Sequence, residues 1–367
     1  MHLAFVMKTR TEKGAFMPTL IHGGDWAGFA AEYGRLPLDF SANISPLGLP
    51  EGVRDAIASA AAQQDRYPDP LCRSLCAAIA ESRGLPENWV LCGNGAANLI
   101  WRLAIAEKPR HALLVAPTFA EYASALQSIG CEVQEYVLDA RDDFAIGRDF
   151  LDLITPETDI VLLCEPNNPT GRTTDRTLLQ DVLESCRKNN TLLVVDECFN
   201  EFLDDPSAHT LESCLSQNPQ LLILKAFTKW YAMAGVRLGY LLGSSPDRLE
   251  RLRRAGQPWA VSGLAQAAGI AALKEKEYSR ALHALIAAQR PLMAAGLTSL
   301  GCRVVPGEAN YLLFYHPARD LVGALRRKGV LIRDCSNYTG LEQGWYRCAV
   351  RSPAENQTFL RVMQEVL

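Results

Sequence analysis

The chain has 367 residues, of which 48% are hydrophobic and 21% are charged, a composition typical of folded proteins and not of disordered or membrane-embedded ones. At roughly 150 residues per domain, this length predicts two domains, or one large and one small. The net charge is −4, and no Lys/Arg stripe is longer than RLRR at 251–254, which argues against a nucleic-acid partner.

The cysteine pattern indicates neither a metal site nor a redox motif. The 11 cysteines are scattered, without a C-x-x-C pair or a close histidine, and free thiols in this number favour a reducing compartment. The apolar LAFVM near the N-terminus is interrupted by Lys8 and Arg10 before a signal peptide could be completed, and no run of about 18 apolar residues follows. We therefore expect a cytoplasmic protein that does not span a membrane.

The first 60 residues contain Gly/Pro-rich turns and little periodicity, so we expect an arm that forms part of a smaller domain. From about residue 89, short apolar runs alternate with helical patterns; these runs are WVLCG, HALLVA, DIVLLCEP, TLLVVDE, LLILKAF and GYLLGS. Such runs are typical of strands buried on both faces, and intervening segments such as 176–189 are long enough for crossover helices. Residues 61–255 are thus predicted to form a large α/β layered domain.

The pattern changes after residue 255. An Ala/Leu-rich stretch to about residue 288 predicts one or two helices, and the strand candidates CRVVPG, NYLLFYH, VLIRDC and YRCAVR follow. Residues 256–367 are therefore predicted to form a smaller α+β domain.

Three polar side chains follow apolar strands of the predicted sheet. Asn168 comes after DIVLLCEP, Asp196 ends TLLVVD, and Lys229 follows LLILKAF, with Arg237 eight residues downstream. Ligands of open α/β sheets collect at the carboxyl ends of the strands. A lysine can hold an aldehyde cofactor as a Schiff base, a carboxylate can keep a pyridine nitrogen protonated, and an arginine can bind a phosphate. Each residue alone also suits a turn, a cap or a surface amine, but together they indicate a pyridoxal phosphate (PLP) site.

Across essentially the whole chain, these residues resemble the aspartate-aminotransferase-like superfamily of fold type I PLP enzymes. The resemblance implies a large domain with a mixed, mostly parallel sheet and helices on both faces, a small α+β domain, and a homodimer. It also implies that Lys229 forms the Schiff base, Asp196 pairs with the pyridine nitrogen, Asn168 binds the ring hydroxyl and Arg237 holds the phosphate. Lys225 lacks the downstream AGVRLGY register that Lys229 has.

Further cofactor positions follow from the same resemblance. The loop CGNGAANLI offers the backbone amides of Gly95, Ala96 and Ala97 at a predicted helix start, where an anion is favoured. Phe119 matches the aromatic residue that stacks on the cofactor ring, although a core aromatic is the competing interpretation. Tyr67 resembles the tyrosine that reaches the phosphate from the neighbouring subunit, which would make the active site depend on two chains.

Two positions depart from the superfamily pattern. Ala226 stands where a serine commonly donates to the cofactor phosphate, which leaves open whether Thr228 takes its place. Phe199 stands where aminotransferases have a tyrosine that bonds the ring hydroxyl, and its loss is expected to alter the electronics of the cofactor.

Two subfamilies, histidinol-phosphate aminotransferase and the L-threonine O-3-phosphate decarboxylase of cobalamin biosynthesis, both fit the chain. The decarboxylase is the closer likeness at IHGGDW, DFSANISPLG, PTFAEY, DECFNEF, FTKWYAMAGVRLGY, QPWAVSGLAQ, VLIRDCSNYTGL and YRCAVRSPAEN. That likeness implies decarboxylation of L-threonine O-3-phosphate to (R)-1-aminopropan-2-yl phosphate. The aminotransferase is the alternative. A preference for L-serine O-phosphate also stays open, because one methyl group is worth only about 1–3 kcal/mol of discrimination.

A substrate with a carboxylate and a phosphate needs two cationic groups in its site. By resemblance, Arg347 binds the carboxylate and Arg333 the phosphate. The remaining matches to substrate contacts are His22, Gly23, Asn43 and Asn168.

The orientation of the carboxylate selects the reaction. Held out of the plane of the cofactor ring, the carboxylate leaves as carbon dioxide, and held in plane, it permits transamination. Lys229 or water would return the proton. Arg351 replaces a glycine of the aminotransferases, and either a contribution to the positive field or a surface position fits it.

Overall fold

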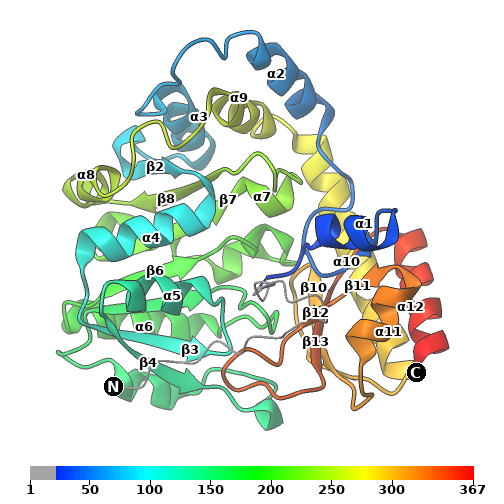
Figure 1. Cartoon of the computed structure of the whole chain (residues 1–367). Coiled ribbons are helices and arrows are strands. Elements are labelled where there is room, and N and C mark those ends of the chain that lie inside the picture. The colour runs from blue at the N-terminus through cyan, green and yellow to red at the C-terminus, as the bar shows by residue number, and fades with distance from the viewer. Residues whose placement is uncertain (1–21) are drawn as a thin grey trace, which may run out of the picture.

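The computed structural model describes residues 22–367, so the first part of the predicted arm and the LAFVM segment lie outside the described residues. The chain forms a seven-stranded sheet, a four-stranded sheet and a two-stranded pairing. Helices surround the seven-stranded sheet on the left of Figure 1, and the smaller sheet lies on the right beside the C-terminal helices.

The large sheet has the order β2-β8-β7-β6-β5-β3-β4. Neighbours from β4 to β7 pair in parallel, whereas β8 is antiparallel to both β7 and β2. The predicted mixed, mostly parallel sheet is therefore confirmed. Its strands are β2 (Val90–Gly93), β3 (His111–Ala116), β4 (Glu132–Val137), β5 (Ile160–Cys164), β6 (Leu192–Asp196), β7 (Leu221–Ala226) and β8 (Gly239–Gly243).

Six of these strands coincide with the six apolar runs of the sequence because both faces of the sheet are covered. Successive residues face opposite sides, so that Leu162 packs in one core cluster and Val161 in the other. Strand β4 is missing from the sequence prediction. Its sequence EVQEYV lies at the sheet edge and is mostly exposed, so it carries charged residues in place of an apolar run.

The helix predicted over 176–189 forms as α6 (Arg176–Lys188), begun by the Asp175 carboxylate, which accepts hydrogen bonds from Thr177 N at 2.9 Å and Leu178 N at 3.2 Å. The other helices that accompany the large sheet are α2 (Glu51–Ala61), α3 (Arg73–Arg83), α4 (Gly95–Glu107), α5 (Glu121–Ser128), α7 (Phe227–Trp230), α8 (Pro246–Arg254) and α9 (Gly263–Ala272).

The small sheet is antiparallel, in the order β12-β13-β10-β9. Its strands are β9 (Arg303–Val304), β10 (Tyr311–Tyr315), β12 (Arg333–Asp334) and β13 (Trp345–Ala349), and its helices are α10 (Lys276–Ser299), α11 (Leu321–Lys328) and α12 (Pro353–Val366). The Ala/Leu-rich stretch forms two helices, α9 and α10. The second continues about a dozen residues past its predicted end near residue 288.

The N-terminal segment is more ordered than its weak periodicity suggests, because it contains the helices α1 (Trp26–Tyr33) and α2. Between them, β1 (Leu38–Asp39) pairs in parallel with β11 (Val330–Leu331), beside the small sheet. Helix α2 instead contacts α9. The domain boundaries near residues 60 and 255 stay a prediction.

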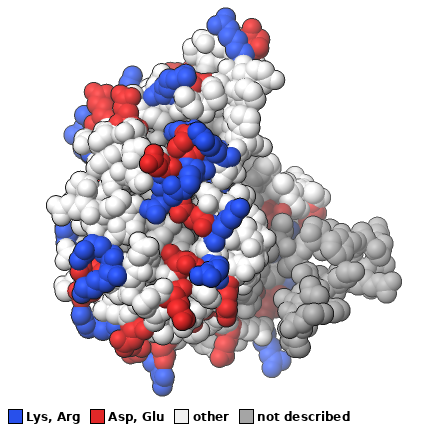
Figure 2. Space-filling view, turned by 90° about the vertical axis from the view of Figure 1, so that its left-hand side faces the viewer, with Lys and Arg blue, Asp and Glu red and all other residues white. Residues whose placement is uncertain are grey.

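On the face drawn in Figure 2, acidic and basic side chains alternate over short distances, so neither sign of charge dominates that face. Over residues 22–367, no helix combines the length and the apolar character that a bilayer crossing requires. Within the same residues, no cluster of three or more His, Cys, Asp or Glu side chains is arranged to hold a metal ion.

Candidate active site

A cavity of about 400 Å³ opens at the carboxyl ends of β5, β6 and β7. The fold places Asp196 at the last position of β6 and Lys229 in α7, directly after β7. Of the predicted site residues, those that line this cavity are His22, Gly23, Asn43, Ala96, Ala97, Phe119, Asn168, Asp196, Thr228, Lys229, Arg237, Arg333 and Arg347. Gly95 lies against the Arg237 guanidinium but is not a lining residue of the cavity. Tyr67 lines a different cleft.

Lys229 is held in an environment that favours its neutral amine. Burial lowers its pKa to about 8, and the nearby guanidinium groups of Arg347 and Arg237 act in the same direction. No carboxylate of residues 22–367 lies within 4.0 Å of its amine. A neutral amine is the nucleophilic form of lysine, so this site suits attack on a carbonyl group.

Lys225 occupies the opposite environment although it lies only four residues upstream. Its ammonium group is buried in ion pairs with Glu197 at 3.0 Å and Glu201 at 3.2 Å. Burial alone would lower the pKa of Lys225, but the two carboxylates raise it above its ordinary value. Lys225 is therefore a structural cation, absent from the cavity that Lys229 lines.

The Asp196 carboxylate is fixed by two donors. The Tyr122 hydroxyl donates to Oδ2 at 2.6 Å, and the Cys198 amide donates to Oδ1 at 2.9 Å. Burial raises the pKa of Asp196, and these hydrogen bonds and Lys229 oppose that rise. Both oxygens keep a free lone pair, so the carboxylate can still bind a protonated ring nitrogen.

The start of α4 forms a cradle of the kind that a phosphate needs. Gly95 has a φ of +76°, and a Cβ there would stand 2.6 Å from Nη2 of Arg237. A Cβ on Gly239 would stand 2.7 Å from the Ala96 amide. The two glycines thus allow backbone amides and the Arg237 guanidinium to lie close together at the N-terminus of α4. This set of hydrogen-bond donors fits the phosphate of PLP.

The loop after β5 is braced against the loop that carries Phe119. Asn167 donates from Nδ2 to the Pro117 carbonyl at 3.0 Å, and Thr118 Oγ1 donates to Asn167 Oδ1 at 2.9 Å. Phe119 meets the Tyr122 ring edge-on at a centroid distance of 5.5 Å and faces the cavity. This brace fixes the aromatic wall relative to Asn168.

Two buried arginines of the small sheet point into the cavity together. Arg333 on β12 and Arg347 on β13 are directly opposite each other in the antiparallel register, so their side chains share a face. Arg333 donates from Nη2 to Asn337 Oδ1 at 2.8 Å and lies over the Tyr338 ring at 5.4 Å. Arg347 donates from Nη2 to the Ser41 carbonyl at 2.8 Å and from Nη1 to Asn168 Oδ1.

The described part of the chain places no counter-charge beside these arginines. Within residues 22–367, no carboxylate lies within 4.0 Å of Arg237, Arg333 or Arg347. Nε of Arg347 and Oδ1 of Asn43 are also buried without a hydrogen-bond partner in that part of the chain. Buried cations and unpaired polar atoms are unfavourable alone, so the cavity is built for an anionic ligand that also donates a hydrogen bond.

The positions that sequence reasoning left open now have locations. Ala226, Phe199 and Thr228 all line the cavity. Arg351 neither lines it nor lies free at the surface. Its guanidinium is paired with Glu355, Nη2 to Oε1 at 2.7 Å, and it donates to the Asp39 carbonyl at 3.2 Å.

Tyr67 is remote from the other predicted residues of its own chain. Its side chain is 81% exposed and stacks on Trp259 at a centroid distance of 4.6 Å. It borders a separate cleft of about 740 Å³ between α2 and α9.

Sequence reasoning missed several residues that shape the cavity, among them Ser41, Tyr122, Cys198 and Tyr338. Tyr122 carried the best signal, since it lies three residues after Phe119 at the start of a helix. The contact of Ser41 with Arg347 spans more than 300 residues of sequence, and no local pattern indicates it.

Comparison with known proteins places the chain in a family. Residues 37–363 match the aminotransferase class I and II family, and the chain belongs to it. It is 38% identical to the threonine-phosphate decarboxylase of Salmonella typhimurium (strain LT2), over 94% of this chain and 96% of that protein. It is 33% identical to histidinol-phosphate aminotransferase 1 of Cupriavidus pinatubonensis, over 89% and 87%.

Solved structures agree on the fold. The histidinol-phosphate aminotransferase of Clostridium acetobutylicum superposes with a TM-score of 0.84 at 28% identity, over 89% of this chain and 98% of that one. The L-threonine-O-3-phosphate decarboxylase of Porphyromonas gingivalis superposes with a TM-score of 0.76 at 25% identity, over the same shares. The predicted resemblance, fold type and PLP cofactor are therefore confirmed, and the chain is a PLP-dependent enzyme.

Proposed function

We propose that this enzyme decarboxylates L-threonine O-3-phosphate to (R)-1-aminopropan-2-yl phosphate, for the assembly of the cobalamin nucleotide loop. The observation that carries the proposal is the pair of buried, uncompensated guanidinium groups of Arg333 and Arg347 at opposed positions of β12 and β13. Together they present two positive charges to one side of the cavity. A substrate with a phosphate and a carboxylate supplies two matching anionic groups.

We assign the following roles to the site. Gly95, Ala96, Ala97, Thr228 and Arg237 hold the cofactor phosphate, Phe119 stacks on the ring, and Asp196 and Asn168 bind the ring nitrogen and hydroxyl. His22, Gly23, Asn43, Asn168, Arg333 and Arg347 bind the substrate. When bound, PLP supplies an electron sink for the charge left at Cα of an amino acid.

The protein contributes orientation and proton handling to that chemistry. Arg347 is fixed by Ser41 and Asn168, so it can hold a carboxylate in one direction. Asp196 provides the negative charge that keeps a ring nitrogen protonated. Lys229, with its pKa lowered to about 8, can hold or release a proton near neutral pH and so return one to Cα.

The deciding experiment is incubation of the purified enzyme with L-threonine O-3-phosphate. Release of carbon dioxide without any keto acid supports the proposal. Glutamate-dependent amino transfer to imidazole-acetol phosphate would establish the aminotransferase instead. Parallel assays with L-serine O-phosphate measure the preference for the methyl group, which we expect to be about 5- to 150-fold, as one methylene-sized contact allows.

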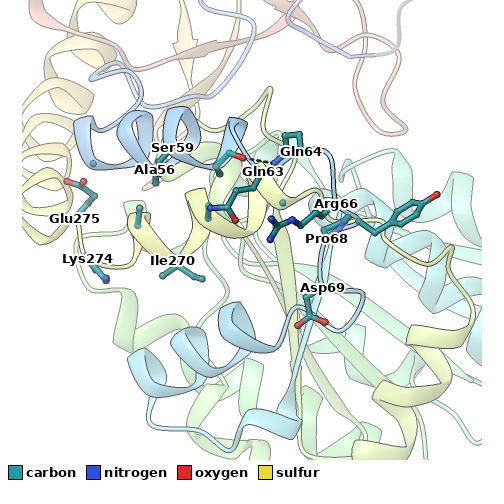
Figure 3. Close-up of a pocket in the computed structure, with 16 residues that line it drawn as sticks. Ala56, Ser59, Gln63, Gln64, Arg66, Pro68, Asp69, Ile270, Lys274 and Glu275 are labelled. Carbon is teal, nitrogen blue, oxygen red and sulfur yellow. Dashed lines mark hydrogen bonds between the residues drawn. The ribbon is translucent and has the colours of Figure 1, made fainter.

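We also propose that the enzyme works as a homodimer with shared active sites. The cleft between α2 and α9 is lined mostly by small and polar side chains (Figure 3), and Tyr67 is one of its lining residues. Tyr67 and its stacking partner Trp259 are both exposed, at 81% and 44%. Large exposed aromatic residues beside a cleft are typical of protein interfaces, and a second copy of the chain would cover them.

A cytoplasmic location is our proposal as well. All 11 cysteines are unpaired in the structure, and free thiols persist in a reducing compartment.

A further inference from the structure

His22 and Gly23 line the active-site cavity, and the segment 22–24 to which they belong is anchored at one end to Ser41. The amide of Gly24 donates to Ser41 Oγ at 2.7 Å. Gly23 lies so close that a Cβ would stand 2.3 Å from the Ser41 carbonyl oxygen. That same oxygen accepts the hydrogen bond from Arg347. The Ser41 carbonyl therefore contacts both the segment and Arg347, the arginine that we assign to the substrate carboxylate.

The other end of the segment is held by Glu121, the first residue of α5. Its Oε1 lies 2.9 Å from Nε2 of His22. Its Oε2 accepts a hydrogen bond from the indole nitrogen of Trp101 on α4, at 3.1 Å. The His22 ring also packs on Phe119, with 5.7 Å between the ring centroids. The Glu121 carboxylate is thus held by α4 and in turn holds the imidazole.

This arrangement solves two physical problems. The His22 side chain is 48% exposed, so a free imidazole there would sample several rotamers, and its ordering would weaken ligand binding. Glu121 also lines the cavity, and an unpaired carboxylate at that place would repel a doubly anionic substrate. The contact between the two side chains orders the imidazole and masks the carboxylate.

We propose that Glu121, oriented by the Trp101 indole, is a positioning residue that holds His22 and the segment 22–24 closed over the anionic substrate. This inference rests on the proposed function, because it gives His22 the substrate contact assigned above. Glu121 touches neither reacting atoms nor cofactor in this role. It acts through His22, so it should govern substrate affinity and not the chemical step.

Steady-state kinetics of the cofactor-loaded enzyme test the proposal. Glu121→Gln should raise KM for L-threonine O-3-phosphate about 3- to 30-fold, the range that the coupling of adjacent side chains produces, with kcat within about twofold of wild type. Trp101→Phe, which keeps the ring and removes only the N–H, should shift KM in the same direction by less. The exposed Glu135, on β4, provides the matched control Glu135→Gln, which should leave both parameters unchanged.

A double-mutant cycle separates positioning from a general effect of lost charge. If Glu121 acts through His22, the variant with both His22→Gln and Glu121→Gln should have the KM of His22→Gln alone. Additive effects, an unchanged KM in Glu121→Gln, or a fall in kcat larger than the rise in KM would each overturn the proposal. The visible absorbance of the bound cofactor should be the same in all variants.

A second readout does not depend on the substrate. In wild-type holoenzyme, the Nε2 proton of His22 should give an NMR signal protected from exchange, identified by its loss in His22→Gln. That signal should disappear in Glu121→Ala and persist in Glu135→Gln. Persistence in Glu121→Ala would refute the contact. If wild type released no carbon dioxide from L-threonine O-3-phosphate, the proposed function would fail while this signal still decided whether Glu121 holds His22.

Discussion

Lys225 and Lys229 show how two identical side chains, four residues apart, acquire different chemistry from their surroundings. One amine is buried between two carboxylates and the other faces two guanidinium groups. The carboxylates stabilise the charged form of Lys225, whereas burial and the guanidinium groups shift Lys229 towards its neutral form. In the sequence, the residues downstream of Lys229 distinguished it from Lys225 as the predicted Schiff-base lysine. In the fold, the charges around each amine explain why the two lysines differ.

Replacing Lys229 with alanine should abolish turnover and the visible absorbance of bound cofactor, because no other amine lies in the cavity among residues 22–367. The spectrum of protein purified with excess PLP measures this. Retained activity would remove Lys229 from its assigned role. Circular dichroism serves as the control for folding.

Lys225→Met should have the complementary effect. Removal of the ammonium leaves Glu197 buried without its cation, whereas the partly buried Glu201 still pairs with Arg83. Breaking the buried pair in this way costs about 3–5 kcal/mol of unfolding free energy. Urea unfolding measures that loss. The folded fraction should still bind PLP with normal absorbance, and loss of the absorbance without loss of stability would contradict the structural role.

The pKa of Lys229 predicts a pH dependence for cofactor capture. Because burial lowers this pKa from 10.5 to about 8, the amine is protonated and unreactive well below pH 8 and neutral above it. The rate of PLP uptake by cofactor-free enzyme should therefore rise with pH and level off above about pH 8. Stopped-flow absorbance measures it, with a simple alkylamine as the control. A midpoint near the ordinary lysine value would contradict the lowered pKa.

At the scale of elements, the site depends on how strand ends and helix starts meet. The carboxyl ends of β5, β6 and β7 deliver the polar residues, and the N-terminus of α4 approaches them because Gly95 and Gly239 carry no side chain. The register of β12 against β13 then sets Arg333 and Arg347, the arginines that we propose bind the substrate, side by side.

Gly95→Ala tests the α4 cradle. Alanine at a φ of +76° is strained, and its Cβ would displace the Arg237 guanidinium. Loss of one charge-assisted hydrogen bond, about 1.5–3 kcal/mol, should raise the dissociation constant for PLP at least about tenfold. Gly235→Ala is the matched control, because no atom of residues 22–367 lies within 4 Å of its added Cβ. Equal affinities in the two variants would argue against the cradle.

At the scale of the whole molecule, the enzyme joins a large mixed sheet to a small antiparallel one, and the cavity draws residues from both. Arg333 and Arg347 come from the small sheet, whereas Asp196 ends β6 of the large sheet and Lys229 lies in α7, directly after β7. The two sheets are seen in Figure 1. A change in how the two parts pack would therefore change substrate binding more than cofactor binding.

The dimer proposal also belongs to this scale. Ala267→Glu places a charge in the cleft between α2 and α9 and should shift the enzyme towards monomer in sedimentation velocity, with loss of activity if the site is shared. Ala295→Glu, on the exposed side of α10, should leave both unchanged. A wild-type enzyme that is monomeric and fully active would refute the shared site.

Part of the candidate site could be predicted from the sequence, because polar residues that follow buried parallel strands lie at one edge of the sheet. Asn168, Asp196 and Lys229 each follow a buried strand, so parallel strands bring them together wherever the strands pair. The edge strand β4 and the helices α1 and α2 were missed, since an exposed strand lacks an apolar run and a short helix can form against tertiary contacts without strong periodicity.

What the sequence determined by itself is the position of six buried strands and of the polar residues Asn168, Asp196 and Lys229 that end or follow three of them, because these are encoded in local apolar runs and in the residues that end them. Only the tertiary structure decided that Lys225 is buried in ion pairs, that Tyr122 fixes Asp196, that Arg351 pairs with Glu355, and that Ser41 and Glu121 hold the segment 22–24 at the cavity. Several of these contacts join side chains far apart in the chain, and all depend on which way each side chain faces, which no local pattern in the sequence records.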